Sequence, residues 1–249
     1  MTATVSIRGL EVRYGDRVGL RDLDVELTGP CTVAVIGPNG SGKSTLLAAI
    51  AGLATPSAGE VVVDAPSPPA LVLQSTDVDR SLPITVRDTV RLARYPRLGL
   101  LRRFSGADHE AVEDAMARLS VDDLAGRQLH ELSGGQRQRV LVAQGLAQDA
   151  SILLLDEPVT GLDVVSRDVI LEAIDAERAE GRLVVTTTHN LEDARRSDVV
   201  VLLDTAPVAV GTPEAVLTDQ HLGQAFGGRF LRIGERVVLD DPHHQPHGH

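Results

Sequence analysis

Short apolar segments recur along this chain, and stretches with helical periodicity separate several of them. Residues 3–27 alternate between apolar and polar positions as antiparallel strands do, with a turn at Tyr14-Gly-Asp16. Later segments are short, apolar and rich in β-branched residues: 31–36, 60–63, 70–73, 151–155, 183–187 and 199–203. This alternation predicts an α/β fold with a mainly parallel core sheet and added antiparallel strands near the N-terminus.

The periodicity changes between about residues 82 and 148, where the pattern predicts only helices. Residues 110–119 place apolar side chains at helical spacing, and Asp108 precedes them as a candidate N-terminal cap. We therefore predict an all-helical subdomain of about 82–148 inserted into one α/β domain spanning residues 1–239. Two short strands are expected around Ile233-Gly-Glu235.

The composition is that of a soluble globular protein and narrows its partners. Hydrophobic residues make up 43% of the 249 but aromatic residues only 2%, so Val, Leu, Ile and Ala must build the core. The net charge of −11 argues against broad binding to nucleic acid or anionic lipid. The single cysteine, Cys31, excludes an internal disulfide and opens an apolar strand. Because neither a secretory signal nor an apolar run of ~20 residues is seen, we expect a cytoplasmic protein.

The most specific motif follows the first buried strand and reads G-x-x-x-x-G-K-S, the pattern of a phosphate-binding loop. Its Lys43 is the only lysine among 24 lysine and arginine residues. We expect Lys43 to contact the β- and γ-phosphates, backbone amides from Gly40 to Ser44 to cradle phosphate oxygens, and the Ser44 hydroxyl to bind Mg²⁺. The predicted nucleotide-binding residues of this loop are Gly37, Pro38, Asn39, Gly40, Ser41, Gly42, Lys43, Ser44 and Thr45.

A second motif is a buried strand, Ile152-Leu-Leu-Leu, that ends in the adjacent carboxylates Asp156 and Glu157. Ligands of open α/β sheets collect at the carboxyl ends of strands. We expect Asp156 to hold Mg²⁺, directly or through water, and Glu157 to position or deprotonate the attacking water. Two acidic residues after a strand are also common in solvated turns. This motif therefore indicates a catalytic site only in combination with the phosphate-binding loop.

A third motif, Leu132-Ser-Gly-Gly-Gln136, heads a helical stretch at 137–148 and makes a second helix start suited to anions. One nucleotide has one triphosphate, yet the chain carries two such helix starts. The simplest resolution is a head-to-tail homodimer in which each such segment caps the nucleotide held by the other chain. The residues assigned to this role are Ser133, Gly134, Gly135 and Gln136.

In this order and over nearly the full length, these motifs resemble those of the ATP-binding cassette (ABC) ATPases, P-loop NTPases whose cofactors are ATP and Mg²⁺. The resemblance implies that Tyr14 stacks on adenine, although a turn aromatic can also pack locally. It further implies that Gln74 senses Mg²⁺, that Asp163 of Thr160-Gly-Leu-Asp163 crosses the dimer interface, and that His189 contacts the γ-phosphate. Asn190 departs from the family, which usually carries an acidic residue there. We expect this departure to tune hydrolysis without removing it.

Size and composition indicate which kind of cassette protein this is. The chain has one cassette, no sustained heptads and no zinc-finger cysteines, so it resembles the separate ATPase subunit of a bacterial importer. Such a subunit lies on the inner face of the cell membrane and docks on integral membrane permease subunits. The run of arginines at 91, 94, 97, 102 and 103, interleaved with Leu98, Leu100, Leu101 and Phe104, occupies the part of the cassette that receives the permease. A solvated basic face is the alternative interpretation.

The substrate is indicated by weaker signals. Residues 81–86, 99–104 and 221–226 resemble the zinc and manganese importer ATPases, which work with an extracytoplasmic metal-binding protein. The last ten residues, 240–249, have the composition of a disordered tail and include His243, His244, His247 and His249. Imidazoles bind zinc, but such a tail can also be inert or the remnant of an expression tag. The rival hypotheses are a siderophore or other nutrient importer, and a non-transport cassette ATPase acting on nucleic acid or ribosomes.

Overall fold

The polypeptide forms two compact units in the computed structural model, which describes residues 2–74, 83–98, 103–227, 230–233 and 236–239. The first unit comprises Met1–Thr4, Thr28–Thr32 and Val63–Thr186. The second comprises Val5–Leu27, Val33–Val62 and Thr187–His249. Within the described ranges, no helix is long and apolar enough to cross a membrane.

Parallel strands form the sheet of the first unit. Strand β6 (Ile152–Leu155) pairs with β5 (Ala70–Val72) on one side and with β7 (Leu183–Thr187) on the other, both in parallel. All four residues of β6 are buried. Continuous apolar strands of this kind belong to sheets covered on both faces. The parallel pairing agrees with the mainly parallel core sheet predicted from the sequence.

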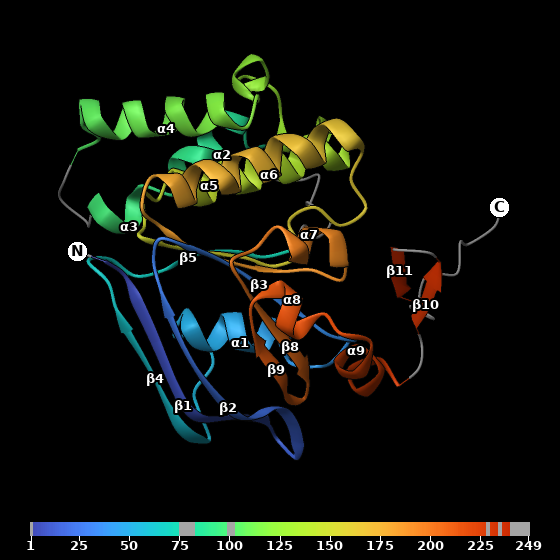
Figure 1. Ribbon diagram of the computed structural model, residues 1–249. Helices are drawn as coiled ribbons and strands as arrows, with labels where there is room; N and C mark the ends of the chain where they lie inside the picture. Colours follow the sequence, from blue (N-terminus) through green and yellow to red (C-terminus); the bar gives the residue numbers. More distant parts are fainter. Residues whose placement is uncertain (1, 75–82, 99–102, 228–229, 234–235, 240–249) are drawn as a thin grey trace. The chain divides into compact units, whose positions relative to one another are not determined.

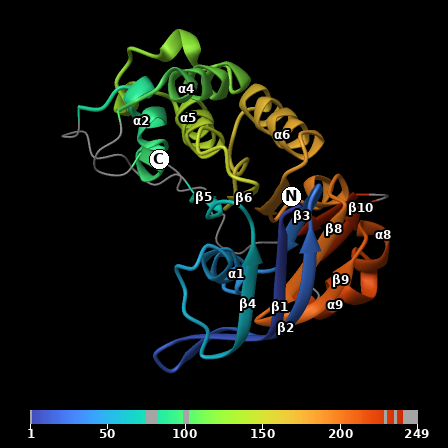
Figure 2. The same ribbon diagram turned by 90° about the vertical axis from the view of Figure 1, so that its left-hand side faces the viewer.

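Helices fill the chain between β5 and β6 in the described ranges 83–98 and 103–148, with one isolated bridge between Thr85 and Gln128. In Figures 1 and 2, α2, α4, α5 and α6 lie together. These elements are α2 (Val86–Leu92), α3 (Tyr95–Leu98), α4 (Gly106–Arg118), the 3₁₀ turns Asp122–Leu124 and Leu129–Glu131, α5 (Gly134–Leu146) and, after β6, α6 (Val164–Ala179).

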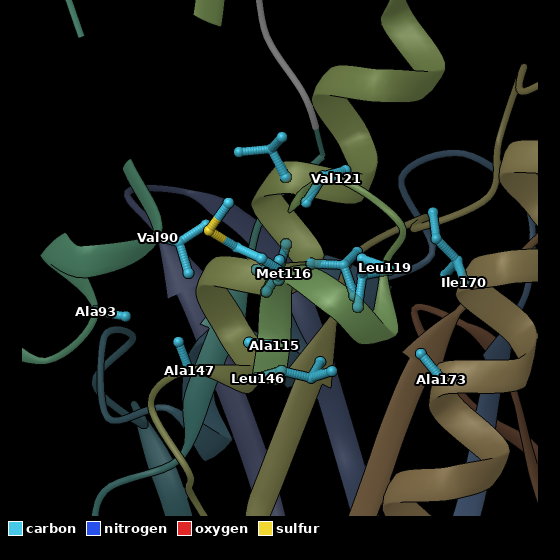
Figure 3. Packing of buried hydrophobic residues seen from close by; sticks show 14 of the residues in the cluster. Val90, Ala93, Ala115, Met116, Leu119, Val121, Leu146, Ala147, Ile170 and Ala173 are labelled. Carbon is cyan, nitrogen blue, oxygen red and sulfur yellow. The ribbon is translucent and has the colours of Figure 1, made fainter. Parts of the chain in front are cut away.

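The core of the first unit is aliphatic, as the low aromatic content requires. Met116 of α4 and Leu119, the C-cap of that helix, are fully buried, and Figure 3 shows them among Val90, Val121 and Leu146. Burying one such side chain contributes about 1.5–3 kcal/mol. The inserted helices therefore share one continuous hydrophobic cluster with the strands of this unit.

Helix α4 begins earlier than the sequence pattern predicted, because Ser105 and not Asp108 is its N-cap. The backbone N–H of Asp108 donates to Ser105 Oγ at 3.3 Å, and the Asp108 carboxylate accepts from the Ser105 N–H at 2.9 Å. This reciprocal pair is a capping box. The prediction that Asp108 caps the helix was therefore wrong in position, although Asp108 does take part in the cap.

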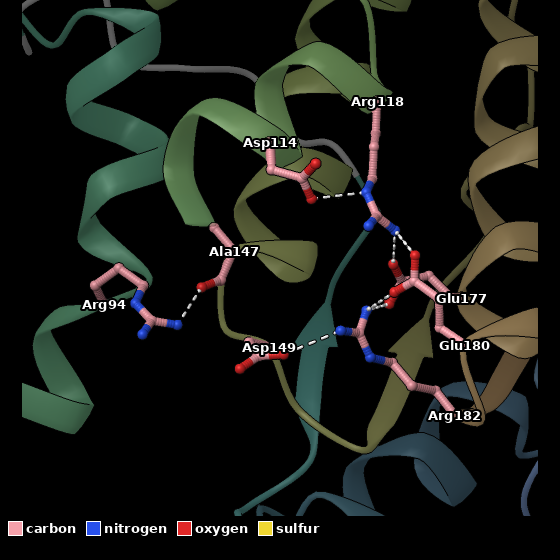
Figure 4. A network of polar contacts seen from close by, with 8 residues as sticks. All are labelled: Arg94, Asp114, Arg118, Ala147, Asp149, Glu177, Glu180 and Arg182. Carbon is pink, nitrogen blue, oxygen red and sulfur yellow. Dashed lines mark hydrogen bonds and ion pairs between the residues drawn. The ribbon is translucent and has the colours of Figure 1, made fainter. Parts of the chain in front are cut away.

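Arg94 is not part of a basic docking face. Its side chain is 9% exposed, and its guanidinium lies 2.9 Å from the Asp108 carboxylate. The guanidinium also donates to the carbonyl of Ala147 at 2.9 Å, as Figure 4 shows. It thus joins the residues after α2 to the start of α4 and the end of α5. Arg102, Leu100 and Leu101 lie outside the described residues. Arg94 is therefore removed from the residues proposed to dock on the permease, because its side chain holds α4 and α5 together.

The Arg94→Ala variant should lower the free energy of unfolding by about 3–5 kcal/mol, because it leaves the buried Asp108 carboxylate without its cation. Urea unfolding of the purified protein measures this change. Arg87→Ala is the matched control, since Arg87 pairs with Glu113 at the surface, where the two side chains are 48% and 51% exposed. Such a surface pair contributes about 0–1 kcal/mol. Equal losses in the two variants would contradict the assignment.

The contribution of Asp108 to the stability of the fold should depend on pH, because the pKa of its carboxyl is shifted. Hydrogen bonds from Ser105, then the contact with Arg94, lower the pKa of the carboxyl from 3.8 to about 2. A lowered folded-state pKa means that the ionised carboxylate stabilises the fold at pH values above its unfolded pKa. This stabilisation is lost as the pH falls from about 4 towards 2. The destabilisation caused by Asp108→Asn should therefore shrink over the same interval.

A network of charged side chains joins α4 to the C-terminal end of α6 (Figure 4). Arg118 lies 3.1 Å from Glu177 and 2.6 Å from Glu180, while Arg182 pairs with Glu177 and, at 3.0 Å, with Asp149. Burial raises the pKa of the Glu177 carboxyl, and the two arginines oppose that shift. The inserted helices and α6 are thus tied by polar contacts as well as by the apolar core.

The second unit carries a three-stranded sheet in the order β2-β1-β4 (Figure 2) and a second group of strands. Strand β3 (Cys31–Ile36) is wholly buried, Cys31 included, and pairs in parallel with β8 (Val199–Asp204). Strand β8 pairs antiparallel with β9. The elements are β1 (Thr4–Tyr14), β2 (Arg17–Thr28), β4 (Ala58–Asp64), β9 (Ala206–Gly211), α1 (Lys43–Ile50), α7 (Leu191–Arg195), α8 (Pro213–Val216) and α9 (Asp219–Phe226).

The C-terminal strands were predicted, whereas β9 was missed. Strands β10 (Phe230–Ile233) and β11 (Arg236–Leu239) pair antiparallel, and they are the two short strands expected in this part of the chain. Strand β9 contains Pro207, which argues against a strand unless the strand is at an edge. It is the last strand of its sheet, and its pairing shifts register between Leu202 and Leu203, near Pro207. The histidines of 240–249 lie outside the described residues.

Candidate functional site

The glycine-rich loop links the end of β3 directly to the first turn of α1. Gly42 is the N-cap of α1 and has a φ of 101°, in the left-handed region that favours glycine. A Cβ at this position would lie 2.6 Å from the carbonyl oxygen of Gly19, so a side chain there would collide with backbone. The backbone N–H groups of the loop and the N-terminus of α1 therefore lie next to each other, which is the arrangement that binds phosphate.

Lys43 is held inside this loop and is only 6% exposed. Its Nζ donates to the carbonyl oxygens of Gly37 at 2.8 Å and Pro38 at 3.0 Å. These bonds fold the side chain back over the loop that was predicted to bind the phosphates. An ammonium has three donors on one compact atom, so the same Nζ can bind an anion within the loop.

Tyr14 lies beside the same loop, within the second unit. A Cβ on Gly19 would lie 2.9 Å from the Tyr14 ring and 3.2 Å from Thr45 Oγ1. Tyr14 is 54% exposed, so much of this residue is accessible to a ligand. The turn aromatic therefore borders the helix start that follows the loop, where the sequence predicted an adenine-stacking residue.

His189 follows β7 on an exposed turn of the second unit. The residue before it, Thr188, donates its backbone N–H to Val35 of β3 at 3.1 Å. Asn190, which follows, caps α7 by accepting the N–H of Glu192 at 2.8 Å, and its own N–H donates to Thr188 Oγ1 at 3.0 Å. Both neighbours of His189 are thus anchored by hydrogen bonds.

The capping role of Asn190 explains why asparagine can stand where the family usually carries an acidic residue. A carboxylate and an amide oxygen both accept a hydrogen bond from the first turn of a helix, so either residue can serve as the N-cap. Neither the capping role of Asn190 nor its backbone hydrogen bond to Thr188 Oγ1 was identified from the sequence. An Asn followed by two acidic residues, Glu192 and Asp193, is a helix-start signal that could have identified the cap.

Asp156, Glu157 and Gln74 come together at the ends of neighbouring strands in the first unit. The N–H of Asp156 donates to Val72 of β5 at 2.9 Å, and the Asp156 side chain is largely buried. Glu157 has a φ of 48°, a conformation that costs free energy for a residue with a side chain and is often found at functional sites. Gln74 Nε2 donates to Glu157 Oε2 at 3.3 Å. The predicted metal sensor therefore touches the predicted base.

The Ser133-Gly-Gly-Gln segment opens α5 with a capping box. Ser133 Oγ accepts from the N–H of Gln136 at 3.2 Å, and Gln136 Oε1 accepts from the N–H of Ser133 at 3.1 Å. Gly134 is exposed and Gly135 is buried. The predicted helix start is therefore present, and its cap is made by the predicted residues.

Asp163 lies next to this segment within the same chain. It is the N-cap of α6, and its Oδ1 accepts the N–H of Ser166 at 2.9 Å, which lowers the pKa of the carboxyl. A Cβ on Gly135 would lie 2.6 Å from Asp163 Oδ2 and 2.5 Å from Ser166 Oγ. Glycine at position 135 thus permits the start of α5 to pack against the start of α6.

Known proteins with similar sequences cover nearly the whole chain. The chelated iron transport system membrane protein YfeB of Yersinia pestis is 39% identical over 94% of this chain and 83% of its own length. The manganese transport system ATP-binding protein MntB of Listeria innocua is 35% identical, over 90% and 96% respectively. The zinc transport system ATP-binding protein TroB of Treponema pallidum is 34% identical, over 91% and 88%.

A solved structure and a family model agree with these relatives. A transporter solved in an inward-facing conformation, provisionally assigned to the metal-chelate type of ABC transporters, superposes with a TM-score of 0.81 at 27% identity over 95% of each chain. The family model described as ABC transporter matches residues 20–160, which include the phosphate-binding loop and both carboxylates. The chain therefore belongs to the ABC transporter family, as one of its ATP-hydrolysing members.

Proposed function

We propose that this chain is the ATP-hydrolysing subunit of a membrane transporter that imports a divalent metal ion, zinc or manganese. The observation that carries the proposal is the extent of the similarity to ATP-binding proteins named for manganese and zinc transport, about nine-tenths of the chain in each case. Similarity over that length reaches beyond the nucleotide site, which all cassettes share. It supports a common reaction, and the names of these relatives support the substrate class.

In this proposal the phosphate-binding loop holds ATP and the carboxylates drive its hydrolysis. Lys43 and the amides of residues 40–44 neutralise and orient the phosphates, and Tyr14 stacks on the adenine. Glu157 accepts a proton from the attacking water, while His189 donates to the γ-phosphate. The unusual backbone conformation of Glu157 and its hydrogen bond with Gln74 support this role, because that hydrogen bond helps to orient the carboxylate.

The donor set fits Mg²⁺, which prefers oxygen ligands. Asp156 offers a largely buried carboxylate at the end of β6, and Ser44 offers a hydroxyl in the first turn of α1. Gln74 uses its amide nitrogen on Glu157, so its amide oxygen is the atom available for a metal. When bound, the ion would neutralise charge on the transferred phosphate.

We propose that two copies act as a head-to-tail homodimer when ATP is bound. Ser133, Gly134, Gly135 and Gln136 of one copy would cap the triphosphate of the other, and Asp163 would lie at the interface. Val164 and Val165 directly follow Asp163 and are 73% and 69% exposed. Exposed apolar side chains next to the proposed interface support burial by a partner chain.

The permease subunits would dock on the inserted helices. Leu92 and Tyr95 are 47% and 54% exposed, and Arg91 lies 4.7 Å from the centre of the Phe104 ring. The Arg91 guanidinium thus lies over the Phe104 ring, and aromatic residues and arginine are enriched at protein interfaces. In this arrangement residues 1–239 form one cassette on the inner face of the cell membrane, with the helical subdomain at about 82–148. An extracytoplasmic metal-binding protein would deliver the ion.

A chelated-iron or siderophore importer is the second candidate, favoured by the similarity to a chelated iron transport protein. Coexpression with candidate permease subunits of a metal importer and of an iron-chelate importer tests both. We expect copurification, and uptake of radioactive zinc or manganese that disappears with Glu157→Gln. Uptake of an iron chelate instead would select the second candidate. Copurification with nucleic acid or ribosomes, without a membrane protein, would contradict transport altogether.

A further inference from the structure

Arg17 lies beside the phosphate-binding loop, although no sequence motif includes it. It is the first residue of β2, directly after the turn that follows Tyr14. A Cβ placed on Gly40 would lie 3.2 Å from Arg17 Nη2, so the guanidinium reaches the backbone of the loop. Both residues belong to the second unit. A second cation therefore accompanies Lys43 at this loop.

The position of this guanidinium is not explained by a protein partner. The exposed side chain of Arg17 forms no hydrogen bond or ion pair with the part of the chain that the structure describes. Arginines of the neighbouring strand do have such partners, since Arg13 pairs with Glu11 and Arg8 with Glu60. Arg17 instead extends towards a glycine whose φ of 81° and missing Cβ leave the space open.

We propose that Arg17 binds a phosphate oxygen of the nucleotide, as a second cationic ligand beside Lys43. The inference rests on the proposed function, in which this loop holds the phosphates of ATP. A guanidinium is a planar fork of N–H donors that matches phosphate oxygens and strengthens each hydrogen bond with its charge. Lys43 is buried within the loop, whereas Arg17 approaches the loop from the β1–β2 hairpin. The two cations thus contact the phosphates from different elements.

If Arg17 binds a phosphate, its substitution should weaken the binding of ligands that carry phosphates and leave the binding of the base and ribose unchanged. We expect Arg17→Ala to weaken MgADP binding by about 5- to 20-fold, as loss of a charged hydrogen bond does, with adenosine binding unchanged. Arg17→Lys should recover part of the affinity, because lysine keeps the charge but lacks the fork. The loss should shrink at high salt, since Arg17 is exposed.

Isothermal titration with MgADP and with adenosine measures these affinities. Arg21→Ala is the matched control, because Arg21 is exposed on the same strand and should bind MgADP as the wild type does. An Arg17→Ala affinity within twofold of the wild type would overturn the inference. Equal losses for MgADP and adenosine would also overturn it, since they would indicate a displaced Tyr14.

Lys43→Ala separates this inference from the proposed function. If Lys43→Ala abolishes MgADP binding while Arg17→Ala has no effect, the loop holds the nucleotide and only the role of Arg17 is wrong. If neither substitution alters MgADP binding, the assignment of the loop fails, and the Arg17 inference fails with it. Weaker binding in both variants, with adenosine unaffected by Arg17→Ala, supports the two-cation site.

Discussion

The Glu157→Gln variant is expected to bind ATP with nearly wild-type affinity and to hydrolyse it about 10²–10⁴-fold more slowly. Glutamine keeps the size of the side chain and one acceptor oxygen, so the contact with Gln74 survives. It cannot accept a proton at neutral pH, and general-base catalysis is lost. Steady-state phosphate release and nucleotide titration measure the two quantities separately.

Glu172→Gln is the matched control for this variant. Glu172 is an exposed residue of α6 in the same unit, so the same chemical change there should leave turnover unaltered. A Glu157→Gln protein that hydrolyses ATP at the parental rate would show that another group takes the proton. A loss of ATP affinity equal to the loss of turnover would instead show that Glu157 serves in binding.

The conformation of Glu157 is the part of this site that sequence could not predict. The strand before it was evident from four consecutive apolar residues, and the two carboxylates from their place at its end. Its φ of 48° depends on how the chain leaves β6 and is not encoded by residue type, since glutamate normally avoids this region. Sequence therefore located the candidate base but not its strained backbone.

In the fold as well, features set by neighbouring residues were predicted, whereas contacts between residues distant in sequence were missed. The strands at 31–36 and 183–187 were predicted with the observed bounds, because buried apolar runs identify such strands directly. Arg94 was misassigned because its partner, Asp108, lies fourteen residues away, and a charge pattern does not show which cation is buried. The contact of Arg17 with the loop was missed for the same reason, since hairpin and loop meet only in the folded unit.

Lys43→Arg provides the second large effect, although it keeps the charge. Lys43 is 6% exposed, and its Nζ is held between two carbonyl oxygens at 2.8 and 3.0 Å. A guanidinium is wider than an ammonium and needs its donors in one plane, so it cannot occupy that space without moving the loop. We expect ATP hydrolysis to fall by about 10²–10³-fold, the usual loss when one preorganised donor to a developing charge is removed.

The reverse exchange at an exposed site controls for charge and for composition. Arg21→Lys on β2 should retain full activity, and it would give this chain a second lysine. An amine-reactive ATP analogue should then label two lysines, with ATP protecting only Lys43. In the parent protein the sole side-chain target is Lys43. Full hydrolysis by Lys43→Arg would mean that charge alone suffices, and the bonds of Nζ to the loop carbonyls would then have no part in the geometry that catalysis requires.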